Sequence, residues 1–469
     1  MRLTALLLLS LATFPLCAEP FDELFLDRTM RVDYFHTSTP RGDEIVALAG
    51  VVNDGPWPGS RTNLVDTSNL GKYLFEVIDR DTNQVIFSRG FASVFGEYVT
   101  TGEARERAAT FHESLRFPWP KEPVQVVLKK RDAVNAFQQV WSTVIDPGSR
   151  FVNPAPIRPA GKVWAYLDNG HPSKKVDLLV IGEGYTEAEM PKLRKDVERL
   201  VGKLFATEPF KSRKSDFNVR VLELPATKSG VHRPRTRDDR RSATGVEFNI
   251  FDSERYVLTL DNKALRDVAS SAPYDFLEIL VNEKQYGGGG IFNDQATSSV
   301  DSGFSEYVFV HEFGHHFAGL GDEYYTSDVA YETGGTEHPE PWEPNITANG
   351  AQPKWMSLVT PGTPLPTPWD KEAFEKHQRE YQAERRRLRE QNVPESEMDK
   401  LFRRTQEYET KFLASQTYAG KVGAFEGAGY EAKGLYRPEV DCIMFTRNEV
   451  GFCDVCTRAI HNMIDMQSK

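Results

Sequence analysis

The chain has 469 residues, of which 39 % are hydrophobic and 27 % are charged, and its formal net charge is −11. A chain of this length is expected to form two or three domains. Its composition is typical of a globular protein with sizeable cores and excludes a disordered chain that is too polar to form them. The acidic balance argues against nucleic acid or an anionic membrane surface as a partner.

Residues 1–18 predict a secretory signal peptide. Arg2 gives the positive start, Leu6–Leu9 begins an apolar stretch, and Ala18 is a suitable last residue before cleavage. The alternative is a buried N-terminal helix. Removal of Arg2 would leave 56 basic and 68 acidic residues, a net charge of −12. We therefore expect a secreted or periplasmic protein, and no later run is long and apolar enough for a membrane span.

Residues 19–146 predict an all-β accessory domain. Apolar and β-branched runs recur with polar turns between them, and several short strands at this spacing favour a β-sandwich. We find no catalytic constellation in this part. Residues 147–161 are rich in Pro and Gly and predict a linker. The expected strands are 30–35, 44–52, 73–77, 84–88, 124–128 and 140–144.

Strands and helices alternate from Lys162 onward, so residues 162–469 predict a second domain with a mixed α/β sheet. Val176–Gly182 is a continuous apolar run, typical of a strand covered on both faces. Thr186 begins a capped helix that continues to about Ala206. Gly287–Gly290 predicts a loop, either a close approach of two backbones or a simple turn. Further strands are expected at 217–224, 255–260 and 276–281.

A His-Glu-x-x-His motif lies at 311–315, inside a segment that is apolar nearly all round. Four residues advance a helix by slightly more than one turn, so His311 and His315 point the same way and can chelate one zinc ion. Glu312 is close enough to take a proton from a zinc-bound water. Ser302 or Ser305 is expected to cap the helix, and Gly319 or Gly321 to end it.

The third zinc ligand must follow the helix. In the pattern H-E-x-x-H-x-x-G-x-x-H it is a His six residues beyond the second His, but here that position is Gly321. Asp322 is the next residue and a carboxylate is an acceptable ligand, with Glu323 as its competitor. His316 is rotated well away from His311, so it is either an outer partner of the site or purely structural.

Residues 370–417 form a charged insertion. Helical stretches at 371–391 and 394–416 are separated by Asn392-Val-Pro394, which predicts an antiparallel helical hairpin, and the Pro-rich lead at 361–368 suggests a projection.

Three cysteines remain after residue 18, namely Cys442, Cys453 and Cys456. In an exported protein an odd number indicates one disulfide and one free thiol, which we favour, or a metal site. The alternative is a second zinc site formed by the three cysteines with His461.

Seven segments from Gly182 onward resemble, in order, the immunoglobulin A peptidase family of secreted bacterial zinc metallopeptidases. They include His311-Glu-Phe-Gly-His315 with Asp322-Glu-Tyr324, and Cys442-Ile-Met444. The others are 182–186, 286–293, 425–430, 434–438 and 452–456. The resemblance covers roughly residues 176–460 and does not imply that immunoglobulin A is the substrate.

The resemblance implies a metzincin-like peptidase domain with one Zn²⁺ and a methionine turn, for which Met444 is the expected residue. Tyr430 and Tyr436 precede that turn and are the expected donors to the oxyanion, although a structural role is equally open for either. The fold class expected for the whole chain is therefore α+β or α/β, with the sandwich first and the helical hairpin inserted in the zinc domain.

The sequence thus predicts a secreted zinc endopeptidase whose partner is a protein or peptide substrate. Metal is held by His311, His315 and Asp322, and Glu312 is the general base. Two alternatives remain: a zinc-dependent amidase or deacetylase, and an exported binding or adhesion protein without catalysis. The intact Glu312 and complete ligand set disfavour the last.

Overall fold

The computed structural model describes residues 21–156, 158–236, 239–326 and 338–469, so the expected signal peptide lies outside the described residues. The chain is mixed α and β, with several sheets and eight α-helices among the described residues.

The N-terminal part contains two four-stranded sheets, with the strand orders β5-β1-β2-β8 and β4-β3-β6-β7. Both sheets turn apolar residues into one shared core, for example Val32 from the first sheet and Val77 from the second. The two sheets therefore form a sandwich, the arrangement that the spacing of the expected short strands favours. The elements are α1 (Phe21–Leu24), β1 (Phe25–Ser38), β2 (Glu44–Asn53), β3 (Tyr73–Asp79), β4 (Val85–Phe91), α2 (Val94–Tyr98), β5 (Ala109–Pro120), β6 (Val124–Arg131), β7 (Phe137–Ile145) and β8 (Val152–Asn153).

Two features of this part differ from the expectation. Strand β5 was not predicted, although its buried residues alternate with charged and polar ones as in other half-buried strands, and it pairs with β1 along its length. The expected linker 147–161 contains β8, which pairs in parallel with β2. The Asn53 side chain also donates a hydrogen bond of 3.0 Å to the Pro154 carbonyl. The segment is therefore partly built into the first sheet.

The second part is built on a six-stranded sheet with the order β15-β16-β14-β10-β11-β9. Its four inner strands are parallel, and the two edge strands β15 and β9 are antiparallel to their neighbours. The strands are β9 (Lys162–Leu167), β10 (Val176–Glu183), β11 (Phe217–Glu223), β14 (Phe276–Val281), β15 (Gly288–Ile291) and β16 (Gln295–Ser299), beside a separate pair of β12 (Val246–Phe248) and β13 (Val257–Thr259).

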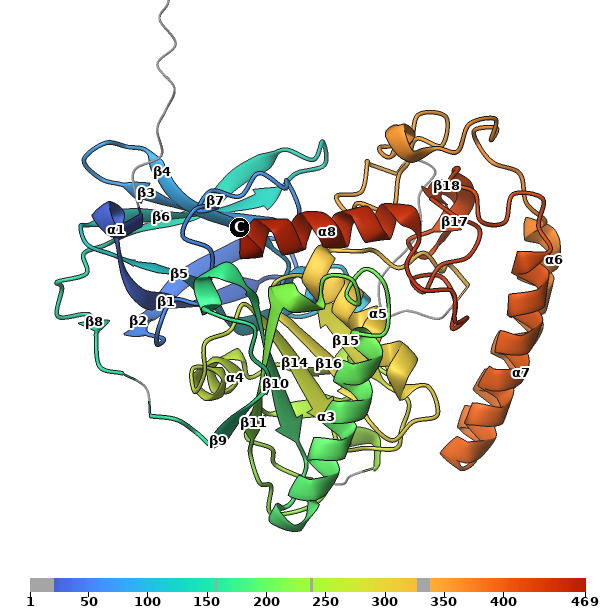
Figure 1. Ribbon diagram of the computed structural model, residues 1–469, viewed down its shortest axis with the longest axis horizontal. Helices are drawn as coiled ribbons and strands as arrows, with labels where there is room; N and C mark the ends of the chain where they lie inside the picture. The colour runs from blue at the N-terminus through green and yellow to red at the C-terminus, as the bar shows by residue number, and fades with distance from the viewer. Residues whose placement is uncertain (1–20, 157, 237–238, 327–337) are drawn as a thin grey trace, which may run out of the picture.

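Helices cover both faces of this sheet, as the continuous apolar run of β10 predicts. Val180 faces the core shared with α3 (Met190–Leu204), α5 (Ser305–Ala318) and α8 (Asp454–Ser468), whereas the next residue, Ile181, faces α4 (Asn262–Ala269). The N-terminal end of α3 is preceded by a capping box, in which the Thr186 N–H donates to Glu189 at 2.9 Å. Figure 1 shows α3 and α4 on opposite sides of the sheet.

The charged insertion is a helical hairpin, as predicted, formed by α6 (Lys371–Glu390) and α7 (Glu395–Ala414). It stands at the edge of the molecule in Figure 1. Its inner face is apolar: Tyr381, Met398 and Phe402 pack against Phe304 and Val308 at the start of α5. The hairpin therefore covers the base of the motif helix. A short two-stranded sheet of β17 (Phe425–Ala428) and β18 (Glu431–Arg437) follows it.

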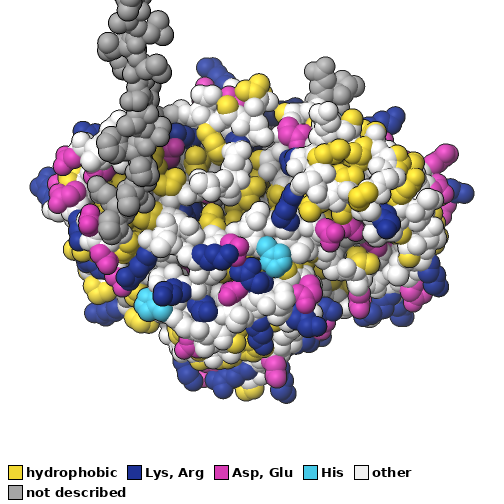
Figure 2. All heavy atoms as spheres, turned by 45° about the horizontal axis from the view of Figure 1, so that its top comes forward, with side chains coloured by type: hydrophobic (Ala, Val, Ile, Leu, Met, Phe, Trp, Pro, Cys, Tyr) yellow, Lys and Arg dark blue, Asp and Glu magenta, His cyan; other side chains and the backbone are white. Residues whose placement is uncertain are grey.

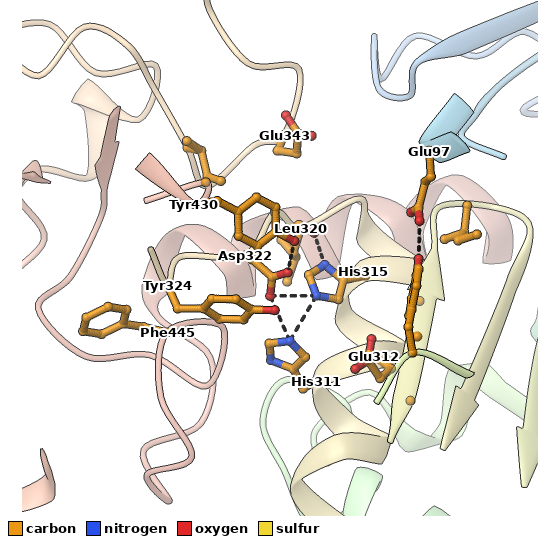
Figure 3. A pocket seen from close by; sticks show the side chains of 18 of the residues that line it. Glu97, His311, Glu312, His315, Leu320, Asp322, Tyr324, Glu343, Tyr430 and Phe445 are labelled. Carbon is orange, nitrogen blue, oxygen red and sulfur yellow. Dashed lines mark hydrogen bonds and ion pairs between the residues drawn. The ribbon is translucent and has the colours of Figure 1, made fainter. Parts of the chain in front are cut away.

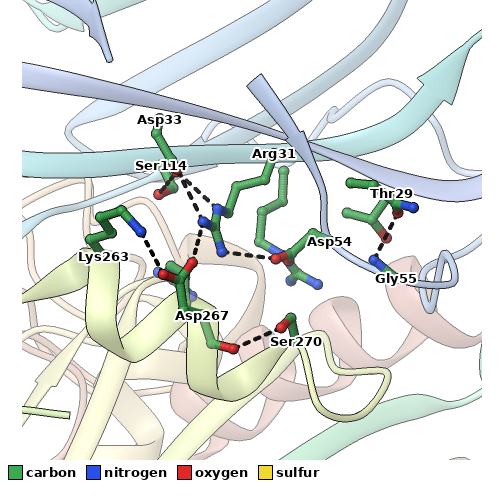
Figure 4. Close-up of polar contacts among 12 residues, drawn as sticks. Thr29, Arg31, Asp33, Asp54, Gly55, Ser114, Lys263, Asp267 and Ser270 are labelled. Carbon is green, nitrogen blue, oxygen red and sulfur yellow. Dashed lines mark hydrogen bonds and ion pairs between the residues drawn. The ribbon is translucent and has the colours of Figure 1, made fainter. Parts of the chain in front are cut away.

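Arg31 of β1 joins the sandwich to the second part (Figure 4). Its guanidinium is 1 % exposed and donates to Asp33 at 2.9 Å, to Asp54 at 3.0 Å and to Asp267 of α4 at 2.5 Å. Asp54 also accepts from Arg116 at 2.8 Å. Buried charges of this kind need every partner, because an unpaired one has lost its hydration.

Replacing Arg31 by Met is expected to lower the free energy of unfolding by about 3–5 kcal/mol, because Asp33 would stay buried without its paired guanidinium and Asp54 would keep only Arg116. Urea unfolding of the whole chain measures the effect. Lys263→Met is the matched control: it removes a 60 % exposed partner of Asp267 and should cost less than about 1 kcal/mol. Equal stability of the two variants would show that the Arg31 network contributes little.

No helix within the described ranges is long and apolar enough to cross a membrane. On the face drawn in Figure 2, acidic and basic side chains are interspersed rather than gathered into one field.

Candidate functional site

The motif helix α5 lies buried between the sheet and α8, with Val310, Phe313 and Phe317 fully buried. Its N-cap is Phe304, which makes no side-chain cap, so neither Ser302 nor Ser305 has the expected capping role. Here packing holds the first turn in place of a cap. The helix ends at Gly319, which is in the left-handed region with a φ of 61°. Of the two glycines expected to end the helix, Gly319 is therefore the one that does.

The glycine run beside the helix is an edge strand rather than a loop. Gly288–Ile291 forms β15, antiparallel to β16, and passes directly over α5. A Cβ on Gly290 would stand 2.3 Å from the carbonyl oxygen of Glu312, so a side chain cannot be accommodated there. The close backbone approach that the glycines allow brings the rim of the sheet to the motif.

Three side chains converge on one point above α5 (Figure 3). Asp322 Oδ1 lies 3.0 Å from His311 Nε2 and 3.1 Å from His315 Nε2, and the two Nε2 atoms are 3.1 Å apart. Ligands at about 2.0–2.1 Å from a tetrahedral zinc stand about 3.3–3.4 Å from one another. Two imidazoles and one carboxylate are a ligand set found at catalytic zinc sites, so these residues fit the expected ion.

The outer contacts of both histidines leave Nε2 free for a metal. His311 Nδ1 donates to the Ile443 carbonyl at 2.9 Å, and His315 Nδ1 donates to the Leu320 carbonyl. Because a carbonyl can only accept, each Nδ1 must carry a proton, so Nε2 is the nitrogen that can bind a metal once its own proton has left. Tyr307 adds a contact of 3.2 Å to His311 Nδ1.

Charges within the site support one another. Burial disfavours ionisation of Asp322, yet the adjacent His315 and His311 hold its pKa well below the usual range. Burial likewise lowers the pKa of His315, but Asp322 outweighs it and raises that pKa to about 9. The three groups form a strongly polar cluster that is able to exchange protons for a cation.

A buried amide fixes the turn that carries Asp322. Asn345 Oδ1 accepts from the Gly321 N–H at 2.8 Å, while its Nδ2 donates to the Gly321 carbonyl and to Glu323 Oε1, each at 2.9 Å. Asn345 is fully buried. Glu323, the competing third ligand, is thereby directed away from the histidines and toward Cys456. Sequence reasoning missed Asn345, because only its distant contacts reveal the role.

Glu312 lies on the cleft side of α5 and is half-buried. One of its carboxylate oxygens and one ring nitrogen from each of His311 and His315 lie within 4.8 Å of one another. Burial raises the pKa of Glu312, and the neighbouring Asp322 adds to this while the histidines oppose it. A carboxylate beside the metal position, with a raised pKa, is suited to accept and return a proton.

The two expected tyrosines occupy different places. Tyr430 lines the cleft and its hydroxyl donates to Asp322 Oδ2. Tyr436 is not among the cleft residues in the described part of the chain; its ring packs against Gly350, and its backbone pairs with Thr347. Tyr324, which follows the ligand segment directly, also lines the cleft and accepts from Arg255 at 3.3 Å.

His316 points to the opposite side of α5 from the cluster. Its Nε2 accepts from the Leu277 N–H at 3.0 Å, and its Nδ1 donates to the Ile291 carbonyl at 2.8 Å. Burial lowers its pKa to about 3, so it stays neutral. His316 therefore ties α5 to β14 and β15, which is the structural one of its two expected roles.

Met444 is fully buried beneath the helix, where its Sδ would stand 3.2 Å from a Cβ on Gly314. The Met444 carbonyl accepts from the Glu323 N–H at 2.9 Å. This contact links the segment below the helix to the turn that carries Asp322.

The cleft around the three converging side chains has a volume of about 460 Å³. Its lining residues come from several parts of the chain, among them Glu97 from the sandwich, Arg255 from the sheet domain and Gln378 from the hairpin. Glu97 also accepts a hydrogen bond from Tyr256 across the two parts (Figure 3). The accessory part thus contributes to the cleft, although its sequence shows no catalytic pattern.

Two family models match this chain. The one described as IgA Peptidase M64 matches residues 165–464, and the one described as Peptidase M64 N-terminus matches residues 20–142. No curated protein matches. The first match alone spans more than half of the chain and contains every residue of the cluster.

Proposed function

The chain belongs to the immunoglobulin A peptidase family M64, and from this premise we propose that it is a zinc-dependent endopeptidase with a metzincin-like catalytic domain. The observation that carries the proposal is the convergence of His311, His315 and Asp322 within 3.0–3.1 Å of one another, with Glu312 beside them.

His311, His315 and Asp322 would hold the zinc ion, which when bound lowers the pKa of a water molecule and polarises the scissile carbonyl. Glu312 accepts the proton of the attacking water and returns it to the departing amine. Tyr430, with its hydroxyl at the edge of the cluster, donates to the oxyanion that develops on the substrate.

Two features support the metzincin-like assignment. The helix ends in a glycine turn after the second His, and Met444 lies beneath it. The third ligand departs from the usual pattern. The position of the usual third His is occupied by Gly321, and the proposed ligand is Asp322, one residue later. A carboxylate brings a negative charge that a neutral imidazole lacks, so the site should hold zinc in a less positive environment.

The substrate is a peptide or protein. A cleft lined by residues from several parts of the chain suits an extended peptide better than a small amide. Secretion or export to the periplasm is part of the proposal, and it rests on residues 1–18 alone.

Incubation with a complex peptide library tests the function. We expect internal peptide bonds to be cut, activity to vanish after zinc is chelated, and activity to return when zinc is added. Release of acetyl groups or of sugar-linked amides, with all peptides intact, would favour the amidase or deacetylase instead. Binding of a protein without any cleavage would favour an adhesion function.

Tyr430→Phe is expected to lower kcat by about 10²–10³-fold while the zinc content stays at the wild-type level, because one donor to the oxyanion is lost. Tyr324→Phe, which changes the neighbouring hydroxyl, is the matched control. If Tyr430→Phe instead weakens zinc binding by about 10–100-fold, its hydroxyl acts by orienting Asp322.

A further inference from the structure

A second group of ligand-type side chains lies below the cleft. Cys442, Cys453, Cys456 and Glu323 are all buried, and one ligand atom from each lies within 4.8 Å of the others. None of them takes part in the proposed hydrolysis. Glu323 comes from one segment, Cys442 from a second, and Cys453 with Cys456 from a third. Because the first segment is far from the others in sequence, the fold must bring the four side chains together.

The sulfur positions match a tetrahedral metal rather than a covalent bond. Cys442 Sγ and Cys456 Sγ are 3.9 Å apart. Thiolates at about 2.3 Å from zinc stand about 3.8 Å from each other, whereas a disulfide needs about 2.05 Å. All three thiols are free. The expected disulfide is therefore not formed in this structure.

Backbone donors point at the sulfurs. The Cys453 N–H donates to Cys442 Sγ and the Cys456 N–H donates to Cys453 Sγ, each at 3.4 Å. Cys453 is the N-cap of α8, so the Cys-x-x-Cys turn opens at a helix N-terminus. Backbone N–H groups that donate to sulfur are a usual outer contact of cysteines that bind a metal, and they hold the sulfur atoms in place.

Glu323 is the fourth side chain of the group. Its side chain is fully buried; Oε1 accepts from Asn345 at 2.9 Å, while Oε2 has no hydrogen-bond partner among the described residues. An unpartnered carboxylate oxygen inside a protein is costly. The buried Arg437 is a nearby cation, but one guanidinium balances only one of four potential negative charges.

We propose that Cys442, Cys453, Cys456 and Glu323 bind a second zinc ion with a structural role. A sulfur-rich tetrahedral set of four protein ligands, closed to solvent, is typical of structural zinc. His461, the fourth ligand weighed from the sequence, is not part of the group; its Nδ1 contacts Arg213 at 3.2 Å.

The second site would stabilise the first through two short links. Glu323 follows the catalytic ligand Asp322, and Cys442 precedes Ile443, whose carbonyl holds His311 Nδ1. A metal that joins these two segments fixes both the third ligand and the orientation of the first. The second zinc site does not depend on peptidase activity, because zinc binding there requires only that the four side chains meet.

Zinc content separates this site from the catalytic one. We expect about two zinc ions per chain in the wild-type protein, one in the double variant His311→Ala/His315→Ala, and none when Cys456→Ser is added to that variant. The double variant needs no activity. Its cobalt-substituted form should show thiolate-to-metal charge-transfer absorption, which a histidine and carboxylate site cannot give.

A second experiment on the wild-type protein is needed in case Cys456→Ser fails to fold. The chain is denatured with a chelator and without a reductant, its free thiols are alkylated, and peptide mass mapping shows which cysteines were modified. All three cysteines should be alkylated in the wild-type protein. A linked pair, or a double variant free of zinc and without cobalt–thiolate absorption, would overturn the proposal and favour the disulfide.

Discussion

Replacing Glu312 by Gln is expected to lower kcat/KM on peptide substrates by about 10²–10⁴-fold, the contribution of a positioned general base. The amide keeps the shape of the side chain but cannot accept a proton at neutral pH. Glu312 is not one of the three converging ligands, so zinc should remain bound at the wild-type level.

Kinetics on one peptide from the library and zinc analysis on the same sample measure both quantities. Glu306→Gln is the matched control: this residue lies in the first turn of the same helix, with its side chain 44 % exposed. Activity of Glu312→Gln within a few-fold of wild type would exclude Glu312 as the base. Loss of zinc along with activity would mean that Glu312 supports the metal site itself.

Local patterns in the sequence predicted the elements that local chemistry determines. The insertion helices, expected at 371–391 and 394–416, lie at Lys371–Glu390 and Glu395–Ala414, because periodicity and the Asn392-Val-Pro394 break are local signals. The capping box at Thr186 is likewise local. Spacing on one helix also brings His311 and His315 together, since a helix has fixed geometry.

Contacts between distant segments could not be predicted in the same way. The glycine run at 287–290 has the composition of a loop, and only the neighbouring α5 explains why an edge strand there needs glycine. Asn345 begins the triplet Asn345-Ile-Thr347, a pattern typical of a glycosylation acceptor on the surface. Its side chain is nevertheless buried and contacts Gly321. Glu323 could be weighed only as a ligand of the histidine site, because nothing local relates it to Cys442, 119 positions away in the sequence.

Asp322→Ala is expected to remove zinc from the histidine site and abolish hydrolysis. Two imidazoles alone would remain, and loss of a direct ligand should weaken binding by more than the about 10–100-fold that follows loss of an outer partner. A zinc titration against a competing chelator measures the affinity. Because the second group of ligands is left intact, the wild-type content should fall by one ion rather than to zero, which also distinguishes the two sites.

His316→Ala is the matched control for Asp322→Ala, since it removes another buried polar side chain from the same segment without touching the converging atoms. It leaves the Leu277 N–H and the Ile291 carbonyl without their partner, at about 1–3 kcal/mol for each unsatisfied group, so the free energy of unfolding should fall. Zinc affinity at the histidine site should stay near wild type. Two outcomes would exclude Asp322 as the third ligand. One is full zinc retention by Asp322→Ala, and the other is an equal loss of zinc affinity in both variants, because removal of a direct ligand must weaken zinc binding more than removal of His316 does.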